Sequence, residues 1–196
     1  MASNWLVLRL TGQYVLDHHS ASQSTPLYDT IVGTWVPEWC EQIAPDVEFP
    51  ELVWSSDVVG AVTADAAEHT GIPAGTPVVA GTIDACAEAA SAGATNPGDL
   101  LLMYGSTMFL IATTSAVLRA ETLWTTQGLS PNFPCLAGGM ASSGSITEWV
   151  SRVTGEDFAT LTERARESGA GAGGLLMLPY FEGERTPIAD PQARGV

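Results

Sequence analysis

Short apolar runs alternate with Gly-, Pro- and Ala-rich stretches along the first half of the chain, a pattern typical of mixed α/β structure. Residues 77–80 form an apolar run that predicts a buried strand, and the Ala-rich residues 85–92 predict a helix. Another helix is expected over residues 63–70, with Thr63 as its cap and Gly71 at its end. The expected order is helix, turn, buried strand, Asp84 and helix.

Asp84 stands where the buried strand gives way to the Ala-rich helix. A carboxylate at the end of a strand is held on a rigid element and can face a cleft, which suits a catalytic base. The same place suits a helix N-cap, where an Asp side chain accepts hydrogen bonds from free backbone N–H groups. On local sequence alone the N-cap is favoured, and both interpretations stay open.

An apolar stripe predicts a further helix over residues 35–43. Trp35, Trp39 and Ile43 recur four residues apart, and Pro37 falls in the first turn. Side chains at this spacing share one helix face. We therefore expect both Trp residues to belong to the core rather than to a ligand platform.

In the second half, residues 100–104 and 108–112 are apolar and predict two strands of a hairpin. Gly105, Ser106 and Thr107 form its tip. Small side chains and free N–H groups at such a tip can wrap a phosphate. A hairpin without any ligand is the commoner interpretation of these three residues taken alone.

The remaining elements are expected in sequence order. Residues 136–141 predict a strand, and Ser142 to Ser145 can cap a helix over 146–153 and bring backbone close to a ligand. Residues 156–167 predict an amphipathic helix, 169–174 a flexible Gly-rich link, and 175–179 a last strand. Residues 180–196 predict a loop.

Composition bounds the class of protein. The 196 residues are 45% hydrophobic and carry 22 acidic against 7 basic side chains, all of them Arg, for a net charge of −15. This balance argues against nucleic acid and against an anionic membrane surface as partners, since both need a basic footprint. It leaves a nucleotide possible, because backbone N–H groups and Mg²⁺ can hold phosphates.

Cysteine and histidine spacing gives no support for a disulfide framework or a metal site. Cys40, Cys86 and Cys135 are odd in number and contain no CxxC pair, so we expect buried, reduced thiols in a cytoplasmic protein. His18, His19 and His69 lack metal-ligand spacing, and no metal site made of protein ligands is predicted. The apolar run over residues 5–8 is too short for a signal peptide or a transmembrane helix.

Several stretches together resemble one family. Their order and spacing match that family over nearly the whole chain. The stretches are Leu10-Thr11-Gly12, Asp17, Ser20-Ala21-Ser22, Asp29, Val59-Gly60, Gly71 to Asp84, Pro97-Gly98-Asp99, Tyr104 to Thr107, Gly183-Glu184-Arg185-Thr186-Pro187, Asp190-Pro191 and Ala193-Arg194-Gly195. The family is that of the FGGY carbohydrate kinases, which includes xylulose, ribulose and glycerol kinases.

The resemblance implies an α/β fold of the actin/hexokinase (ribonuclease H-like) type, in which two domains close over sugar and ATP. Residues 1–95 look like the C-terminal part of the sugar-binding domain, and residues 96–196 like the first part of the ATP-binding domain. Because Asp84 matches the family's catalytic base, which takes a proton from the attacking sugar hydroxyl, the resemblance favours this role over the N-cap. Ala85 follows Asp84 where glycerol kinases carry Gln, so the local sequence is closer to that of pentulose kinases. The resemblance implies that Asp84 and Ala85 contact the sugar.

The nucleotide contacts carry over in the same way. Gly105, Ser106 and Thr107 resemble the second phosphate-binding motif, usually Gly-Thr, and Gly144 matches a glycine near the nucleotide. Glu148 stands where glycerol kinases have a Gln, which puts a direct nucleotide contact there in doubt. The cofactors implied are ATP and the Mg²⁺ that arrives with it.

Two family features are missing: the N-terminal Asp-x-Gly-Thr phosphate hairpin and the C-terminal Gly-rich adenosine region. The chain therefore resembles an internal fragment that we expect to be inactive alone, and exposed apolar surface predicts self-association, such as a homo-oligomer. The alternative is a non-catalytic remnant that acts as an interaction module. A third class, an acetate-kinase-like or heat-shock ATPase of the same superfold, is disfavoured by the Asp84 context and by residues 183–187.

Overall fold

The computed structural model describes residues 1–195, and Val196 lies outside the described residues. The chain forms two compact units that each combine separate stretches of sequence. The first unit holds Met1–Leu101, Ile111–Ala120 and Trp124–Leu136; the second holds Leu102–Leu110, Glu121–Leu123 and the chain from Ala137 onward. The expected domain division at residue 95 stays a prediction.

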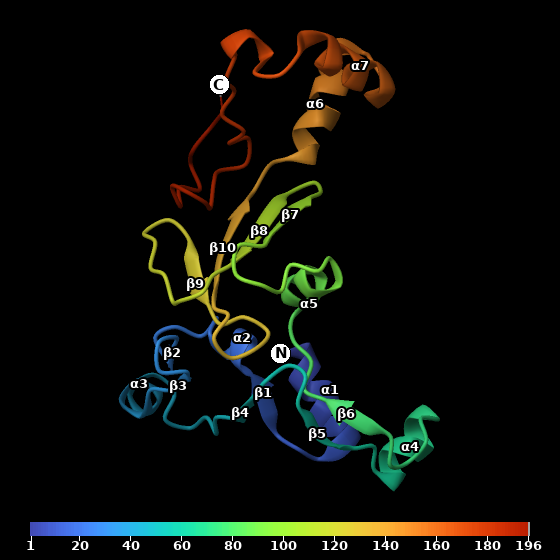
Figure 1. Ribbon diagram of the computed structural model, residues 1–196, viewed down its shortest axis with the longest axis vertical. Helices are drawn as coiled ribbons and strands as arrows, with labels where there is room; N and C mark the ends of the chain where they lie inside the picture. Colours follow the sequence, from blue (N-terminus) through green and yellow to red (C-terminus); the bar gives the residue numbers. More distant parts are fainter. Residues whose placement is uncertain (196) are drawn as a thin grey trace. The chain divides into compact units, whose positions relative to one another are not determined.

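The first unit contains helices, and short strands that pair two by two (Figure 1). Its helices are α1 (Ala2–Thr11), α2 (His18–Ala21), α3 (Pro37–Ile43), α4 (Ala64–Thr70) and α5 (Asp84–Ser91). The strands that precede α5 are β1 (Val15–Asp17), β2 (Tyr28–Asp29), β3 (Thr34–Trp35), β4 (Glu51–Val53), β5 (Val58–Ala61) and β6 (Pro77–Val79). β1 pairs with β4 in parallel, and β2–β3 and β5–β6 are antiparallel pairs.

Helix α4 follows directly from local sequence signals. Thr63 is its N-cap, with the side-chain oxygen accepting a hydrogen bond from the backbone N–H of Ala66 at 3.2 Å. Gly71 ends the helix in the left-handed region at φ 76°, where a residue without a Cβ is favoured. The expected helix with its cap and its stop is confirmed.

The expectation for the two Trp residues holds only in part. Trp35 packs against a core cluster of Leu16, Ala21 and Tyr28, but it lies in β3 rather than in a helix. Helix α3 begins at Pro37, which occupies the first turn, where the missing N–H costs nothing. Trp39 is 42% exposed, so its assignment to the core was wrong.

β6 was expected to be buried, and this prediction is also wrong. Pro77 and Val79 are exposed, Val79 to 49%. The reason is topological: β6 pairs only with β5 in a two-stranded sheet, so the described chain does not cover both of its faces. A continuous apolar run indicates burial only when a sheet is packed on both sides.

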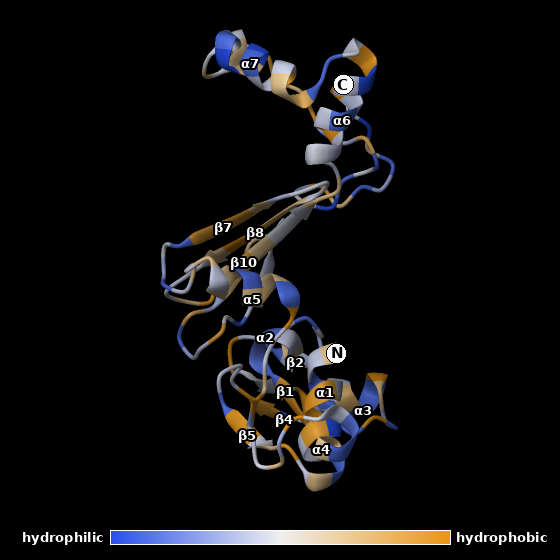
Figure 2. Ribbon diagram, turned by 90° about the vertical axis from the view of Figure 1, so that its right-hand side faces the viewer, coloured by the Kyte–Doolittle hydropathy of each residue, from blue (hydrophilic) through white to orange (hydrophobic). Residues whose placement is uncertain are grey.

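A four-stranded sheet contributes residues to both units. Its strands are β7 (Leu100–Tyr104), β8 (Met108–Thr113), β9 (Trp124–Thr126) and β10 (Cys135–Met140), in the order β7-β8-β10-β9. β7 and β8 are hydrogen-bonded neighbours, which confirms the expected hairpin. Figure 2 shows both as strongly hydrophobic strands. β7 alternates exposed and half-buried residues, as expected for an edge strand.

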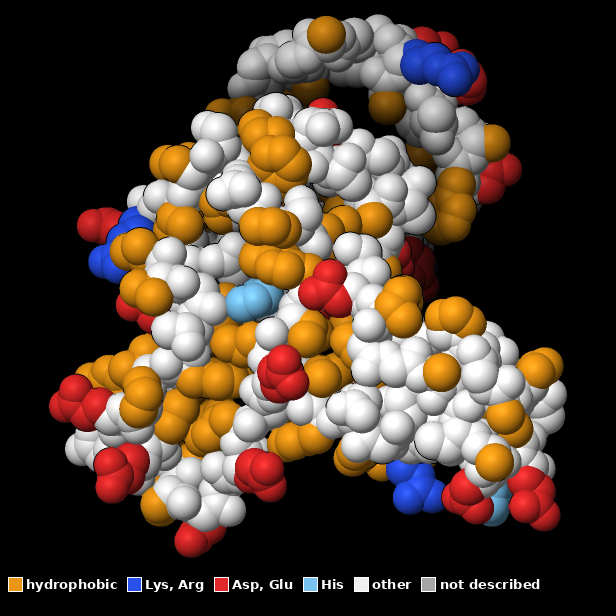
Figure 3. Space-filling model, turned by 60° about the horizontal axis from the view of Figure 1, so that its bottom comes forward, with side chains coloured by type: hydrophobic (Ala, Val, Ile, Leu, Met, Phe, Trp, Pro, Cys, Tyr) orange, Lys and Arg blue, Asp and Glu red, His pale blue; other side chains and the backbone are white. Residues whose placement is uncertain are grey.

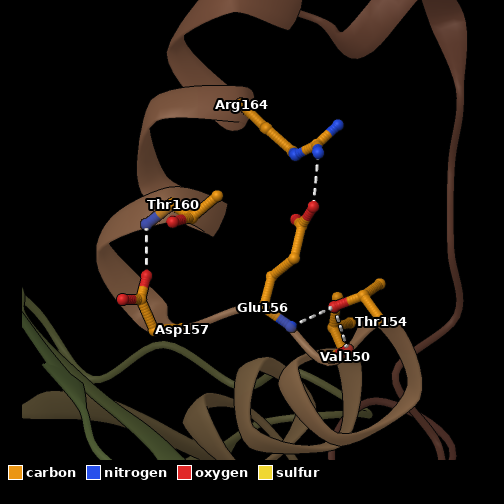
Figure 4. A network of polar contacts seen from close by, with 6 residues as sticks. All are labelled: Val150, Thr154, Glu156, Asp157, Thr160 and Arg164. Atoms are coloured by element: carbon orange, nitrogen blue, oxygen red, sulfur yellow. Dashed lines mark hydrogen bonds and ion pairs between the residues drawn. The ribbon is translucent and has the colours of Figure 1, made fainter.

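The second unit continues from β10 into α6 (Gly144–Thr154), α7 (Phe158–Ser168) and a short 3₁₀ turn, η1 (Ala172–Gly174). A polar network joins α6 to α7 (Figure 4). Glu156 donates its backbone N–H to Thr154 Oγ1 at 3.3 Å and forms an ion pair with Arg164. Asp157 caps α7 by accepting from the N–H of Thr160 at 2.8 Å. Both helices were expected; their starts lie two residues from the predicted ones.

Two expectations near the C-terminal end were wrong. Residues 175–179 form no strand, because no other described segment pairs with them, and an apolar run alone cannot supply the ladder partner. The Gly-rich stretch 169–174 was expected to be a plain link, but it contains η1. The loop that follows carries isolated bridges, one of them between Glu184 and Asp190.

Charge is spread rather than gathered. On the face drawn in Figure 3, some acidic side chains lie among uncharged and hydrophobic ones, and others lie beside a basic side chain or a His. None of the helices over residues 1–195 combines the length and the apolar character needed to cross a bilayer. Within the same residues, no group of three or more His, Cys, Asp or Glu is arranged to hold a metal ion.

Candidate active site

Asp84 is the first residue of α5, and its side chain is exposed. The N-cap position belongs to Ile83, which has extended backbone and makes no side-chain capping bond, so the capping interpretation of Asp84 was wrong. Asp84 Oδ1 accepts the backbone N–H of Ala85 at 2.8 Å. A carboxylate in the first turn also interacts favourably with the helix dipole. Oδ2 has no hydrogen-bond partner among the described residues and remains open to a ligand.

The segment that leads into Asp84 is fixed by a buried carboxylate far away in sequence. Asp17, which is 2% exposed, accepts the hydroxyl of Thr82 at Oδ2 over 2.8 Å. The same oxygen accepts the N–H of Ser20 at 3.1 Å and so caps α2. Gly81 is held in addition by its N–H, which donates to the carbonyl of Ser55 at 2.9 Å. The sequence motif that contains Asp17 does not by itself reveal this anchoring role.

Behind Asp84, α5 packs through Cys86 and Ala89, which are both buried. Burial raises the pKa of the Cys86 thiol to about 12, and burial raises the pKa of Cys135 as well. Both thiols therefore stay protonated and unreactive near neutral pH. Cys40, Cys86 and Cys135 are all free and buried, as expected from the sequence.

An aromatic and histidine cluster belongs to the same unit. His18 Nδ1 lies 2.8 Å from the Tyr28 hydroxyl, and the ring stacks on Trp54 with centroids 4.2 Å apart. His19 is 2% exposed, and its Nδ1 donates to the carbonyl of Gln127 at 2.5 Å. Desolvation by burial lowers the pKa of both His18 and His19, so both are neutral at physiological pH. They support the fold around α2 and are not arranged as metal ligands.

The second candidate region is the tip of the β7–β8 hairpin. The backbone N–H of Gly105 donates to the carbonyl of Thr107 at 2.9 Å and closes the turn. Ser106 and Thr107 are exposed, and neither hydroxyl is hydrogen-bonded within the described part of the chain. Residues 103–109 include no acidic side chain. The tip therefore fits an anion such as a phosphate, with hydroxyl groups as donors.

The start of α6 packs directly on this tip. The N–H of Ser143 donates to the carbonyl of Ser106 at 3.0 Å, and that of Gly144 to the carbonyl of Gly105 at 2.8 Å. A Cβ added to Gly144 would lie 2.5 Å from the carbonyl oxygen of Gly105, so only glycine allows this approach. The structure thus brings Gly144 together with Gly105 and Ser106. Its N–H is used by the hairpin, so Gly144 contributes close packing rather than a donor for a phosphate.

A cavity of about 300 Å³ lies beside the start of α6 and is lined in part by Ser142, Ser143 and Met177. The hydroxyls of Ser142 and Ser143 are buried and have no hydrogen-bond partner within residues 1–195. Glu148 is exposed, and its carboxylate pairs with the guanidinium of Arg152 at 3.4 Å. Its role toward a nucleotide stays a prediction.

Comparison with known proteins connects these observations. Residues 1–90 match the N-terminal domain of the FGGY family of carbohydrate kinases, and residues 100–196 match its C-terminal domain. Xylulose kinase of Escherichia coli is 28% identical over 202 residues, which cover 100% of this chain and 41% of the relative. Glycerol kinase of Nocardia farcinica is 30% identical over 98% of this chain and 39% of its own length. The crystal structure of xylulose kinase from Rhodospirillum rubrum superposes with a TM-score of 0.86 at 34% identity, covering 98% of this chain and 40% of that one.

The fold is accordingly that of sugar kinases of the actin/hexokinase type, as the sequence predicted. Because matches to the two domains of one family account for nearly all of its residues, the chain belongs to the FGGY family of carbohydrate kinases. It spans about two fifths of the length of the curated relatives that it matches.

Proposed function

We propose that this chain is part of an ATP-dependent kinase that phosphorylates a hydroxyl of a sugar or polyol, with a pentulose such as xylulose or ribulose as the preferred class. The observation that carries the proposal is Asp84: an exposed carboxylate at the start of α5, with one oxygen free and the preceding residues anchored through Thr82 and Asp17. Similarity to xylulose kinases supports the substrate class.

In this proposal Asp84 acts as a general base. Oδ2 accepts the proton of the sugar hydroxyl while the hydroxyl oxygen of the sugar forms a bond to the γ-phosphorus. At the same time the bond between the γ-phosphorus and the leaving ADP breaks. Bound ATP with its Mg²⁺ supplies the phosphoryl group and the leaving group. Ala85 lies next to the base and contacts the sugar, where a small side chain leaves room. Because α5 is packed through buried Cys86, the base sits on a rigid element.

The hairpin tip is the proposed phosphate contact. Ser106 and Thr107 would donate their hydroxyls to phosphate oxygens, Gly105 keeps the tip free of bulk, and Gly144 lets α6 pack against it. In this proposal Mg²⁺ arrives bound to ATP. Free buried thiols support work in the reducing cytoplasm. Nucleic acid and membrane are not proposed as partners, whereas self-association is.

The test uses a chimera in which these 196 residues replace the matching segment of Escherichia coli xylulose kinase. ADP release is followed with ATP, Mg²⁺ and a panel of pentuloses, hexuloses and polyols, and the isolated chain, which we expect to be silent, is assayed beside it. Asp84→Asn should lower kcat by at least about 10³-fold while ATP binding is kept. The matched control is Asp65→Asn, also an exposed Asp in the first turn of a helix, which should leave turnover unchanged.

Near-normal kcat in Asp84→Asn would remove this residue from the base role. A folded chimera that binds MgATP and sugar but releases no ADP would favour the non-catalytic interaction module instead.

A further inference from the structure

Glu184 is a buried carboxylate in the loop over residues 183–187. Its side chain is 3% exposed. Oε1 accepts two backbone N–H groups, from Arg185 at 2.7 Å and from Ala141 at 3.2 Å. Oε2 is buried and has no hydrogen-bond partner among the described residues. The contact to Ala141 bridges 43 positions of sequence, so it is a tertiary contact rather than a turn.

The residue that Glu184 holds, Ala141, stands three positions before the start of α6. Ala141 is followed by Ser142, Ser143 and Gly144, and the last two donate their N–H groups to the hairpin tip at 3.0 and 2.8 Å. Hydrogen bonds at both ends of residues 141–144 therefore link Glu184 to Gly105 and Ser106. If Ala141 moves, the α6 start moves against the tip.

A carboxylate at this place is costly to bury. In the described residues Glu184 forms no ion pair with an Arg side chain, and the guanidinium of Arg185 donates to the Met140 carbonyl at 3.4 Å instead. Burying a charge without a cation lowers stability unless hydrogen bonds compensate, and here only two are seen. Burying an apolar residue here would cost less free energy. We therefore look for the role of Glu184 in the backbone groups that it holds in place.

Thr186 attaches the same loop to β10 without a hydrogen bond to residues 141–144. Thr186 Oγ1 accepts the N–H of Gly139 at 3.1 Å, and the Thr186 N–H donates to the Gly139 carbonyl at 3.2 Å. These bonds also attach the loop to β10, but two residues farther from Ser142. Thr186 can thus serve as the matched control for Glu184.

We infer that Glu184 is a positioning residue of the nucleotide site: by holding the Ala141 N–H it sets the Ser142–Gly144 turn against the hairpin tip that receives the phosphates. The inference rests on the proposed function for the identity of the ligand. The hydrogen bonds that connect Glu184 with Ala141, and Ser143 and Gly144 with the hairpin tip, do not depend on that ligand.

The experiment compares Glu184→Ala, Glu184→Gln and Thr186→Val in the 196-residue chain by hydrogen exchange. Glu184→Ala should speed exchange of the Ser143 and Gly144 amides by about tenfold, because the turn loses its anchor. Glu184→Gln should keep exchange within about threefold of wild type, since the amide oxygen still accepts both N–H groups. Thr186→Val should lower the unfolding midpoint without a selective change at Ser143 and Gly144.

Affinity for MgADP is measured in the chimera, together with the KM for the sugar. Glu184→Ala should weaken MgADP binding by about tenfold and leave the sugar KM within about twofold, and Glu184→Gln should restore MgADP binding. If Glu184→Ala does not fold, Glu184→Asp takes its place, because its shorter side chain keeps the charge but does not reach Ala141.

Unchanged exchange at Ser143 and Gly144 in Glu184→Ala, or equal effects of Glu184→Ala and Thr186→Val, would overturn the inference. A wild-type chimera that binds no MgADP would count against the proposed function, while the exchange data would still decide the coupling.

Discussion

The hydroxyl of Thr82 donates to Oδ2 of Asp17 over 2.8 Å and joins two residues that are 65 positions apart. Thr82 stands two residues before Asp84, and Asp17 is at the same time the N-cap of α2. One buried carboxylate thus ties the candidate base to the motif at the start of α2. The hydrogen bond thereby brings together two motifs that lie far apart in the sequence.

We expect Thr82→Val to lower the free energy of unfolding by about 1–3 kcal/mol, because it removes a donor from a buried carboxylate. Urea denaturation of the 196-residue chain measures this. Thr76→Val is the control, since its hydroxyl donates to the Pro73 carbonyl at an exposed turn and its loss should cost less than about 0.5 kcal/mol. Equal losses in the two variants would mean that the Asp17 contact carries no special weight.

Gly144→Ala should separate α6 from the hairpin tip. The added methyl group would meet the Gly105 carbonyl at 2.5 Å, so the helix start must shift, at a cost of about 1–3 kcal/mol. Thermal unfolding and MgADP affinity should both fall. Ser145→Ala removes only the side-chain bond to the Ser106 carbonyl at 3.1 Å, and we expect it to change stability by less than about 0.5 kcal/mol. Wild-type stability in Gly144→Ala would contradict the close approach.

Stability should fall with pH on the acid side of neutrality. The pKa of buried His19 is lowered from 6.5, chiefly by desolvation, so the unfolded chain binds a proton at a higher pH than the folded one. The contribution of neutral His19 to the free energy of unfolding is fully present above the pKa of the unfolded chain. It is lost as the pH falls below 6.5 and through the lower pKa of His19 in the folded chain.

Urea unfolding between about pH 8 and about pH 5 measures the slope, which His19→Gln should flatten. The exposed His69→Gln serves as the control and should leave the profile as it is. A slope that persists unchanged in His19→Gln would assign the effect to other groups, of which His18, also with a lowered pKa, is the next to test.

The buried thiols should resist a water-soluble disulfide reagent. With the pKa of Cys86 raised to about 12 and that of Cys135 raised as well, these two thiols should react at least about 100-fold more slowly in the native chain than in guanidinium chloride. Absorbance of the released thiolate follows the reaction. Fast labelling of Cys86 in the native chain would show that α5 is not packed as described.

Much of the local structure was determined by the sequence itself. Two examples are helix α4, with Thr63 as cap and Gly71 as stop, and the hairpin around Gly105–Thr107. Both depend on contacts between residues a few positions apart, so the local sequence predicts them. The place of Asp84 between strand and helix could be predicted for the same reason, and the family resemblance suggested its role. The sequence could not show that Asp84 lies outside the N-cap position, because a shift of one residue in the helix boundary decides this.

The tertiary structure alone decided the rest. The exposure of β6, the missing strand at 175–179 and the exposure of Trp39 depend on which neighbour lies beside each segment, and an apolar pattern says nothing about that neighbour. The contacts of Asp17 with Thr82, Glu184 with Ala141 and Gly144 with Gly105 join residues 65, 43 and 39 positions apart. Such hydrogen bonds form only after the chain has folded, so the sequence names the residues of this site while packing determines how they hold one another.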